Sequence, residues 1–175
     1  MKKLFKLFSY IFFFLLIILL TLPKENVYYF FEKELKKYNI VFSNEKIKES
    51  FFSLELSSID INFNKSSFSS VDEIDFTFYV FYNTLEINTI NIKKGFIDSY
   101  PSKIEKVYLS YSIFSPSFLS LKAHGNFGKV EGTFSFLSKR LKLKLDQSTL
   151  MDIKYKNILQ EMKKEKKGYS YEYQL

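Results

Sequence analysis

Side chains that could support catalysis are few and scattered along the chain. His124 is the only histidine and there is no cysteine, so a metal site would need His124 together with carboxylates, and no ligand spacing of that kind is present. Asp72, Glu73 and Asp75 form the densest acidic group, which acid–base catalysis could use. Asp72 and Glu73 directly precede a strand pattern, however, which is more typical of a solvated turn.

The serines and glycines also lack a reactive context. Serine is dense at 66–70, but no G-x-S-x-G or S-x-x-K motif marks an activated hydroxyl. Five glycines form no loop that could cradle a phosphate. Asn64-Lys65-Ser66 matches the glycosylation acceptor N-x-S, a pattern short enough to arise by chance. We therefore predict a protein that is not an enzyme, with no catalytic, cofactor-binding or metal-binding residue.

The charge of the chain is basic without the pattern of a nucleic-acid binder. The net charge is +7, yet Arg140 is the only arginine and no basic stripe is visible, so no nucleic-acid partner is predicted. The cluster at 163–167 contains four lysines, which could meet anionic lipid headgroups. Glu161 and Glu165 are interleaved with them, which favours a solvated helix face.

The first 22 residues predict a membrane anchor. Lys2, Lys3 and Lys6 precede an uncharged run from Leu7 to Leu22, which favours a transmembrane helix with a cytoplasmic N-terminus. The predicted localisation is therefore a bacterial inner membrane, crossed once, with the following domain in the periplasm. A cleaved signal peptide is the alternative, but the end of the run lacks the small residues of a cleavage site. The predicted anchor residues are Leu7, Phe8, Ile11, Phe12, Phe13, Phe14, Leu15, Leu16, Ile17, Ile18, Leu19 and Leu20.

Beyond the anchor, the hydrophobic period changes twice. Residues 23–38 form the predicted amphipathic juxtamembrane helix, with Val27, Phe31, Leu35 and Tyr38 on one face. Residues 39–146 alternate with a period of two and predict an antiparallel β domain. Residues 147–175 predict one basic amphipathic helix followed by a final strand.

The predicted fold is thus a membrane-anchored, mainly-β (α+β) protein. It has one N-terminal transmembrane helix, a short amphipathic helix, a curved antiparallel meander sheet of about seven to nine strands, and one C-terminal amphipathic helix. A slip in the alternation at Ser57-Ser58 predicts a β-bulge.

One face of this sheet is strongly apolar and must be covered. It either forms the core of the domain, or it stays open as a groove for an acyl chain or as a surface paired by other subunits. The predicted groove or partner face comprises Phe76, Phe78, Val80, Tyr82, Phe134, Phe136, Leu141, Leu143 and Leu145.

Two local segments carry a resemblance to a known family. Gly128-Lys129-Val130-Glu131-Gly132 resembles a G-x-V-x-G turn and strand, and the Leu-rich stretch 136–143 resembles the closing strand that follows it. Together with the layout of anchor, helix and strands, they resemble the N protein of bacterial type II secretion systems, which is similar to the AsmA-like membrane proteins with lipid-binding grooves. The helix at 148–167 has no counterpart in this resemblance.

The resemblance implies a non-enzymatic structural or assembly subunit of an envelope-spanning machine, either a type II secretion-like apparatus or the periplasmic scaffold of a flagellar motor. Its predicted partners are the membrane and other protein subunits, arranged as a multimeric ring or scaffold. The alternative is an AsmA-like accessory that binds or transports lipid, with phospholipid as the partner of the apolar groove. No cofactor is expected for either function.

Overall fold

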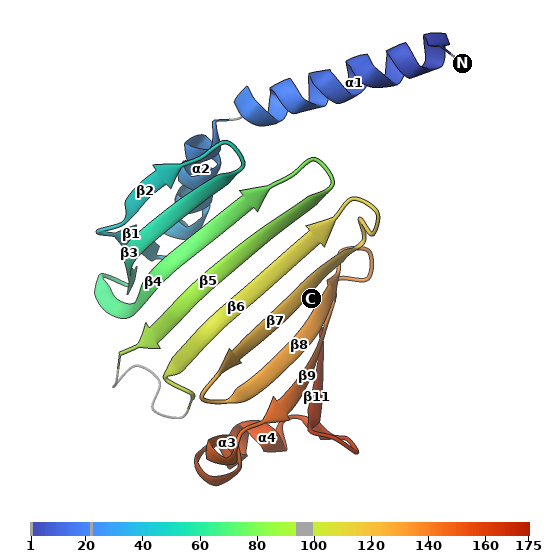
Figure 1. Ribbon diagram of the computed structural model, residues 1–175. Coiled ribbons are helices and arrows are strands. Elements are labelled where there is room, and N and C mark those ends of the chain that lie inside the picture. The colour runs from blue at the N-terminus through green and yellow to red at the C-terminus, as the bar shows by residue number, and fades with distance from the viewer. Residues whose placement is uncertain (1, 22, 94–99) are drawn as a thin grey trace.

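A single curved and twisted layer of strands forms the body of the molecule (Figure 1). The computed structural model describes residues 2–21, 23–93 and 100–175. Its 11 strands form one sheet in the order β1-β3-β4-β5-β6-β7-β8-β9-β11-β10, and β2 also pairs with β3. The strands are β1 (Ile40–Ser43), β2 (Lys46–Glu49), β3 (Ser53–Phe63), β4 (Ser66–Phe78), β5 (Tyr82–Ile92), β6 (Lys103–Ser112), β7 (Phe118–Gly125), β8 (Gly128–Ser135), β9 (Arg140–Gln147), β10 (Lys163–Lys164) and β11 (Tyr169–Gln174).

Four helices accompany the sheet. They are α1 (Lys2–Thr21), α2 (Lys24–Lys36), α3 (Thr149–Lys154) and α4 (Lys156–Gln160). α2 lies beside β1–β3, and α3 and α4 lie beside the lower end of β9, so the helices lie at opposite sides of the strand order (Figure 1). α1 projects away from the sheet.

Consecutive strands from β3 to β9 pair antiparallel, as short hairpin connections require. The β3–β4 turn is formed by Asn64 and Lys65, whose φ angles of 49° and 66° give the left-handed backbone that matches the twist of a tight hairpin. At the β7–β8 turn, Gly128 has a φ of 109°. A Cβ atom there would meet the carbonyl oxygen of Asp146 at 2.2 Å, so only glycine fits.

A row of irregularities crosses β3 to β6. In each of these strands two inward apolar residues lie three positions apart instead of two. The strand alternation therefore changes phase at matching places, and Ser58 and Thr89 take positive φ angles of 59° and 53°. Both apolar rows stay continuous across the change. One row pairs Ile59, Val71, Ile90 and Ile104, and the other pairs Leu56, Ile74, Ile87 and Val107.

The predicted fold class and localisation are wrong in their membrane anchor. Within the described residues, no helix combines the length and the apolarity needed to cross a membrane. The physical reason lies in α1 itself, which includes Lys2, Lys3 and Lys6. Its uncharged part, Leu7–Thr21, is about 22 Å long at 1.5 Å per residue, against a hydrocarbon core of about 30 Å. The predicted single-pass inner-membrane placement, with a periplasmic domain, loses its basis with the anchor.

The predicted strand count and the C-terminal helix also differ from the structure. The sheet has 11 strands, more than the seven to nine predicted. β1, β2 and β10 have only two to four residues, which is too few to show an alternating period in the sequence. The single predicted helix is two short ones, interrupted at Tyr155, whose φ and ψ of −119° and 35° are not helical. Lys163 and Lys164 form β10 instead of the last helical turn, and Gly168 (φ 76°) lies in the turn before β11.

Candidate functional site

The register of the strands separates the sheet into an apolar and a polar face. Directly opposite residues of neighbouring strands project to the same side. One such row pairs Leu54, Phe76, Leu85, Leu109, Leu121, Gly132, Leu143 and Tyr171. The row next to it, on the other side, pairs Glu55, Asp75, Glu86, Tyr108, Lys122, Glu131, Lys144 and Ser170.

The polar face is an ordinary water-facing surface. Cross-strand ion pairs run along it, including Lys106 Nζ to Glu86 Oε1 at 2.5 Å and Arg140 Nη1 to Glu172 Oε1 at 3.1 Å. These side chains are largely exposed, so each pair contributes little stability. Their main consequence is that this face of the sheet is hydrated.

The apolar face is covered only at the two sides of the strand order. Leu56 is 0% exposed and its row partner Ile74 is 6% exposed, and at the far side Leu145 is 4% exposed. Between them the same row continues through Ile87, Val107, Ala123 and Val130, all only half-buried. None of the described residues of β5–β8 is buried. We call the apolar side of these four strands the open face; it comprises Leu85, Ile87, Val107, Leu109, Tyr111, Leu119, Leu121, Ala123, Val130 and Phe134.

α2 provides the cover at one side. Its Tyr28 is buried against Leu54, Leu56 and Ile59, and the Tyr28 hydroxyl donates a hydrogen bond of 2.8 Å to Glu45 Oε1. Burial, and then this bond, raise the pKa of Tyr28 above its ordinary value. Buried Lys24 places its ammonium group 3.1 Å from Glu49 Oε1.

The packed face of α2 therefore differs from the predicted one. Lys24 and Tyr28 are the buried positions, whereas Phe31 and Tyr38 of the predicted face are exposed. Their hydrophobic spacing did not reveal that a tyrosine and a lysine, each with a carboxylate partner, take the inward positions.

α3 and α4 provide the cover at the other side. Met151, Tyr155 and Leu159 pack around Leu145, with Val130 and Tyr169 at the edge of the cluster. Ser148 begins α3, because its side chain accepts a hydrogen bond of 3.1 Å from the Met151 amide.

A separate apolar pocket lies at the C-terminal part of α2. It has a volume of about 460 Å³, within the range of small-molecule sites, and its lining is entirely hydrocarbon. Without a polar group that could orient a polar ligand, this pocket suits an alkyl chain or an apolar side chain. It is lined by Leu35, Ile40, Phe42, Ile61, Phe63 and Phe68.

The predicted groove residues do not all lie together. Six of them lie on the apolar face: Phe76, Phe78, Phe134, Leu141, Leu143 and Leu145. Val80 lies in the β4–β5 turn, and Phe136 follows β8. Tyr82 begins β5 on the polar side, where its hydroxyl lies 3.1 Å from that of Tyr108. The predicted strand continued through 80–82, whereas β4 ends at Phe78 and the chain turns back.

The residues considered for catalysis remain apart. His124 Nε2 lies 3.5 Å from Glu105 Oε2 on the exposed polar face. Asp72 is exposed, and Asp75 accepts a hydrogen bond of 2.9 Å from Thr77. In the described part of the chain no three potential metal-ligating side chains come together.

The predicted anchor residues all belong to α1, and the side chain of Leu19 lies outside the described part of the structure. The most solvent-accessible of them are Leu7, Phe8, Ile11, Phe12, Phe13, Phe14, Ile17, Ile18 and Leu20, while Leu15 and Leu16 are half-buried. α1 therefore presents an apolar surface that the rest of the chain leaves uncovered.

Sequence reasoning missed the central part of the open face, above all Val107, Leu109, Leu119 and Leu121. Their alternation was visible, but alternation alone does not tell a strand under a helix from a strand without one. The lack of any helical pattern between residues 39 and 146 was the available signal, since seven long strands then had only two short helical segments to cover them.

Comparison with known proteins adds no further constraint. No family model matches the chain, and neither a curated protein nor a solved structure is significantly similar to it.

Proposed function

We propose that this chain is a non-enzymatic binding protein that holds the acyl chain of a lipid on its open face. The observation that carries the proposal is that one continuous apolar surface is buried at both sides and only half-buried across β5–β8. Each CH₂ group that leaves water contributes about 0.8 kcal/mol, so an alkyl chain lying along these rows would bind by burial alone.

The chemistry of the open face favours lipid over a polar ligand. Its rows contain Leu, Ile, Val, Ala, Phe and Tyr, together with Gly132 and Asn83, and have no charged member; an extended acyl chain needs no orienting hydrogen bond. The hydrocarbon pocket under α2 would accept the same class of ligand. Binding of lipid would remove apolar surface from water that the fold itself leaves exposed.

The assembly-subunit function stays a prediction that competes with lipid binding. A partner subunit could cover the same face, but strand addition at the sheet edges is hindered by short strands. β1 and β2 occupy one edge with four residues each, and β10 blocks part of the other. We therefore place the lipid on the face first and treat partner subunits as an outcome of the test.

The test is the lipid content of the full-length protein, purified in mild detergent and analysed by mass spectrometry. The double variant L109T/L121T replaces two cross-strand neighbours of the open face. The matched control Y108T/K122T replaces the adjacent cross-strand pair on the polar face. Because α1 is intact in both, lipid that adheres to α1 is the same in both.

We expect the open-face variant to retain several-fold less phospholipid per protein than the control, while both keep a β-type circular dichroism spectrum. Equal lipid content in the two variants contradicts the proposal. The variant Phe63→Ser changes the pocket at α2 and leaves the open face unchanged. Lipid loss in this variant alone would place the ligand in the pocket instead. A lipid-free protein that crosslinks to other subunits in cells supports the assembly function.

A further inference from the structure

A second apolar surface lies at one end of the strands, away from the open face. Four turns meet there: 50–52, 79–81, 113–117 and 136–139. We call this surface the aromatic rim. Its tips are among the most exposed apolar side chains of the molecule, with Phe51 at 75%, Phe114 at 80% and Leu137 at 84%.

Backbone hydrogen bonds join neighbouring turns of the rim. The Phe78 amide donates to the Phe52 carbonyl at 2.6 Å, and the Ile113 amide donates to the Phe81 carbonyl at 3.1 Å. Further along, the Phe136 amide donates to the Ser117 carbonyl at 2.9 Å. The four turns therefore form one continuous row across the width of the sheet.

Ring contacts follow the same row. Phe52 and Tyr79 have ring centroids 5.8 Å apart, and Phe81 and Phe114 have ring centroids 5.7 Å apart. The four turns contain Ser, Pro, Val, Ile, Leu, Phe and Tyr, and Lys139 is their one charged residue. Single exposed apolar residues are normal on a protein surface, but a contiguous row marks an interaction surface.

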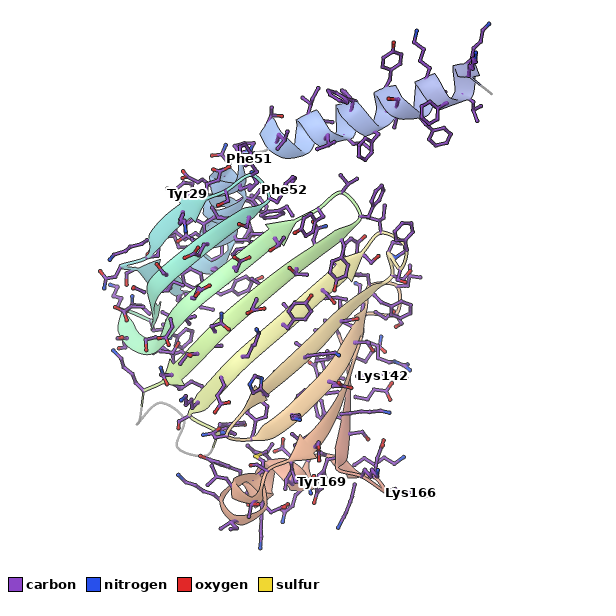
Figure 2. All side chains as sticks on the ribbon, in the orientation of Figure 1. Tyr29, Phe51, Phe52, Lys142, Lys166 and Tyr169 are labelled. Atoms are coloured by element: carbon purple, nitrogen blue, oxygen red, sulfur yellow. The ribbon has the colours of Figure 1, made fainter. Side chains whose placement is uncertain are left out.

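The opposite end of the strands has a different chemistry. The β3–β4 turn there contains Lys65, and residues 163–168 between α4 and β11 contain four lysines and one glutamate. Figure 2 shows Lys166 and Tyr169 at this lower end, and Phe51 and Phe52 at the upper end near the junction of α1 and α2. The lysine-rich segment 163–167 thus lies at the opposite end of the strands from the aromatic rim.

α1 leaves the molecule at the end of the aromatic rim. The Lys24–Glu49 ion pair holds the start of α2 beside the turn at 50–52. α1 precedes this point and extends above that end of the sheet (Figure 1), with apolar side chains exposed on all sides. Two uncovered apolar surfaces from distant parts of the chain therefore lie at the same end.

We propose that the aromatic rim docks on a lipid surface and inserts its tips at the boundary between headgroups and acyl chains. Exposed Phe and Leu tips on projecting turns suit burial at this boundary, and Tyr79 adds an aromatic ring with a polar hydroxyl. A protein partner would instead need a shaped surface with polar groups at its margin. The rim with Lys139 as its one charged residue, the adjacent apolar α1 and the lysine-rich far end all match a lipid surface.

The rim is also continuous with the open face. The ring of Phe136 lies 5.3 Å from that of Phe134 and 6.3 Å from that of Tyr111, both of which belong to the open face. Docking would therefore bring the open face to the lipid surface. This last point rests on the proposed function, whereas docking itself does not.

The chain contains no tryptophan, so a single introduced tryptophan reports on its own position. The full-length variants F114W at the rim and K166W in the lysine-rich segment place this reporter at two exposed sites, and tryptophan at 114 keeps an aromatic ring beside Phe81. Both are mixed with phosphatidylcholine vesicles that contain brominated acyl chains, which quench tryptophan on contact.

We expect F114W emission to shift to the blue and to lose about half its intensity, because a tip inserted about 5–10 Å reaches the acyl chains. K166W should stay unchanged. The proposal is overturned if F114W keeps its water-like emission while the protein sediments with the vesicles, or if both reporters are quenched alike. A blue shift without vesicles, together with a larger particle in light scattering, would also overturn it, because the rim would then bind a second copy.

These outcomes are independent of the lipid-content test. A rim that stays in water leaves the difference between L109T/L121T and its control unchanged, and an open face that holds no lipid leaves the quenching of F114W unchanged.

Discussion

The strands under the helices and the strands between them have apolar side chains of the same kinds, but these side chains differ in burial. Leu56 on β3 is fully buried, because Tyr28 of α2 lies over it. Leu121 on β7 belongs to a row that begins at Leu54 under α2, yet it is only half-buried. The structural core of this sheet is therefore separated from its candidate site by whether a helix lies over the strand, and not by the composition of the strand.

This difference in burial also separates residues that stabilise the fold from residues that we propose bind the ligand. Burial of a Leu or Ile side chain contributes about 1.5–3 kcal/mol, so the two covered clusters account for much of the stabilisation. The open face contributes less in the free protein and keeps its remaining apolar area for a ligand. Substitutions in the covered clusters should therefore affect mainly stability, and substitutions on the open face should affect mainly lipid retention.

Leu56→Ala should have the largest effect, because it opens a cavity in the cluster under α2. We expect a loss of about 2–5 kcal/mol in the free energy of unfolding, measured by urea denaturation and circular dichroism. A loss below about 1 kcal/mol would mean that the cluster under α2 is not the core.

Tyr28→Phe should alter the stability at high pH. The raised pKa of Tyr28 means that, above its ordinary value of 10.0, the unfolded chain loses this proton while the folded chain retains it. Stability is therefore fully present below pH 10 and falls as the pH rises further. The Phe variant should lose about 1 kcal/mol at neutral pH with the Glu45 bond, and should show a shallower decline above pH 10.

Tyr108→Phe is the control for this pH dependence. The hydrogen bond with Tyr82 and partial burial raise the pKa of Tyr108 to about 12, but on the exposed polar face. If Tyr108→Phe reduces the loss of stability above pH 10 as much as Tyr28→Phe does, the burial of Tyr28 under α2 is not the cause of that loss.

Ser148→Ala should destabilise the second cover by about 1 kcal/mol, because the Met151 amide loses its capping partner. Hydrogen exchange should show faster exchange in α3 and little change under α2. Thr149→Ala, one residue further and exposed, is the matched control and should leave the exchange of α3 nearly unchanged.

Leu121→Ala on the open face should have the smallest effect on stability, about 1 kcal/mol or less, because water already reaches this side chain. Its effect should fall on lipid retention instead. A loss as large as that of Leu56→Ala would show that the open face is packed in solution, which would remove the contrast.

Strand positions were largely readable from the sequence, whereas their surroundings were not. The alternation of Leu141, Leu143 and Leu145 lies within β9, and the slip at Ser57-Ser58 lies where Ser58 takes its positive φ. The matching slips in β4, β5 and β6 were missed, because each is recognisable only beside its partner strand. Tyr82 was placed on the wrong face because nothing in Tyr79-Val80-Phe81 resembles a usual turn.

The larger errors concern apolar segments whose environment is not encoded locally. The run in α1 suggested a span because it is strongly apolar and follows three lysines, although its uncharged part is short. The open face was anticipated as one of two alternatives, since a sequence does not specify which apolar strands a helix will cover. The rim was missed for a related reason: its four turns are far apart in sequence and meet only in the folded sheet.

Methyl NMR of the full-length protein, with a fatty acid that carries a nitroxide on its alkyl chain, would show whether an acyl chain binds the open face and not the covered cluster under α2. We predict that the methyl resonances of Val107, Leu109 and Leu121 broaden, while those of Leu54, Leu56 and Ile59 under α2 stay sharp. Methyl resonances of the open face that stay as sharp as those of the covered cluster would contradict the account.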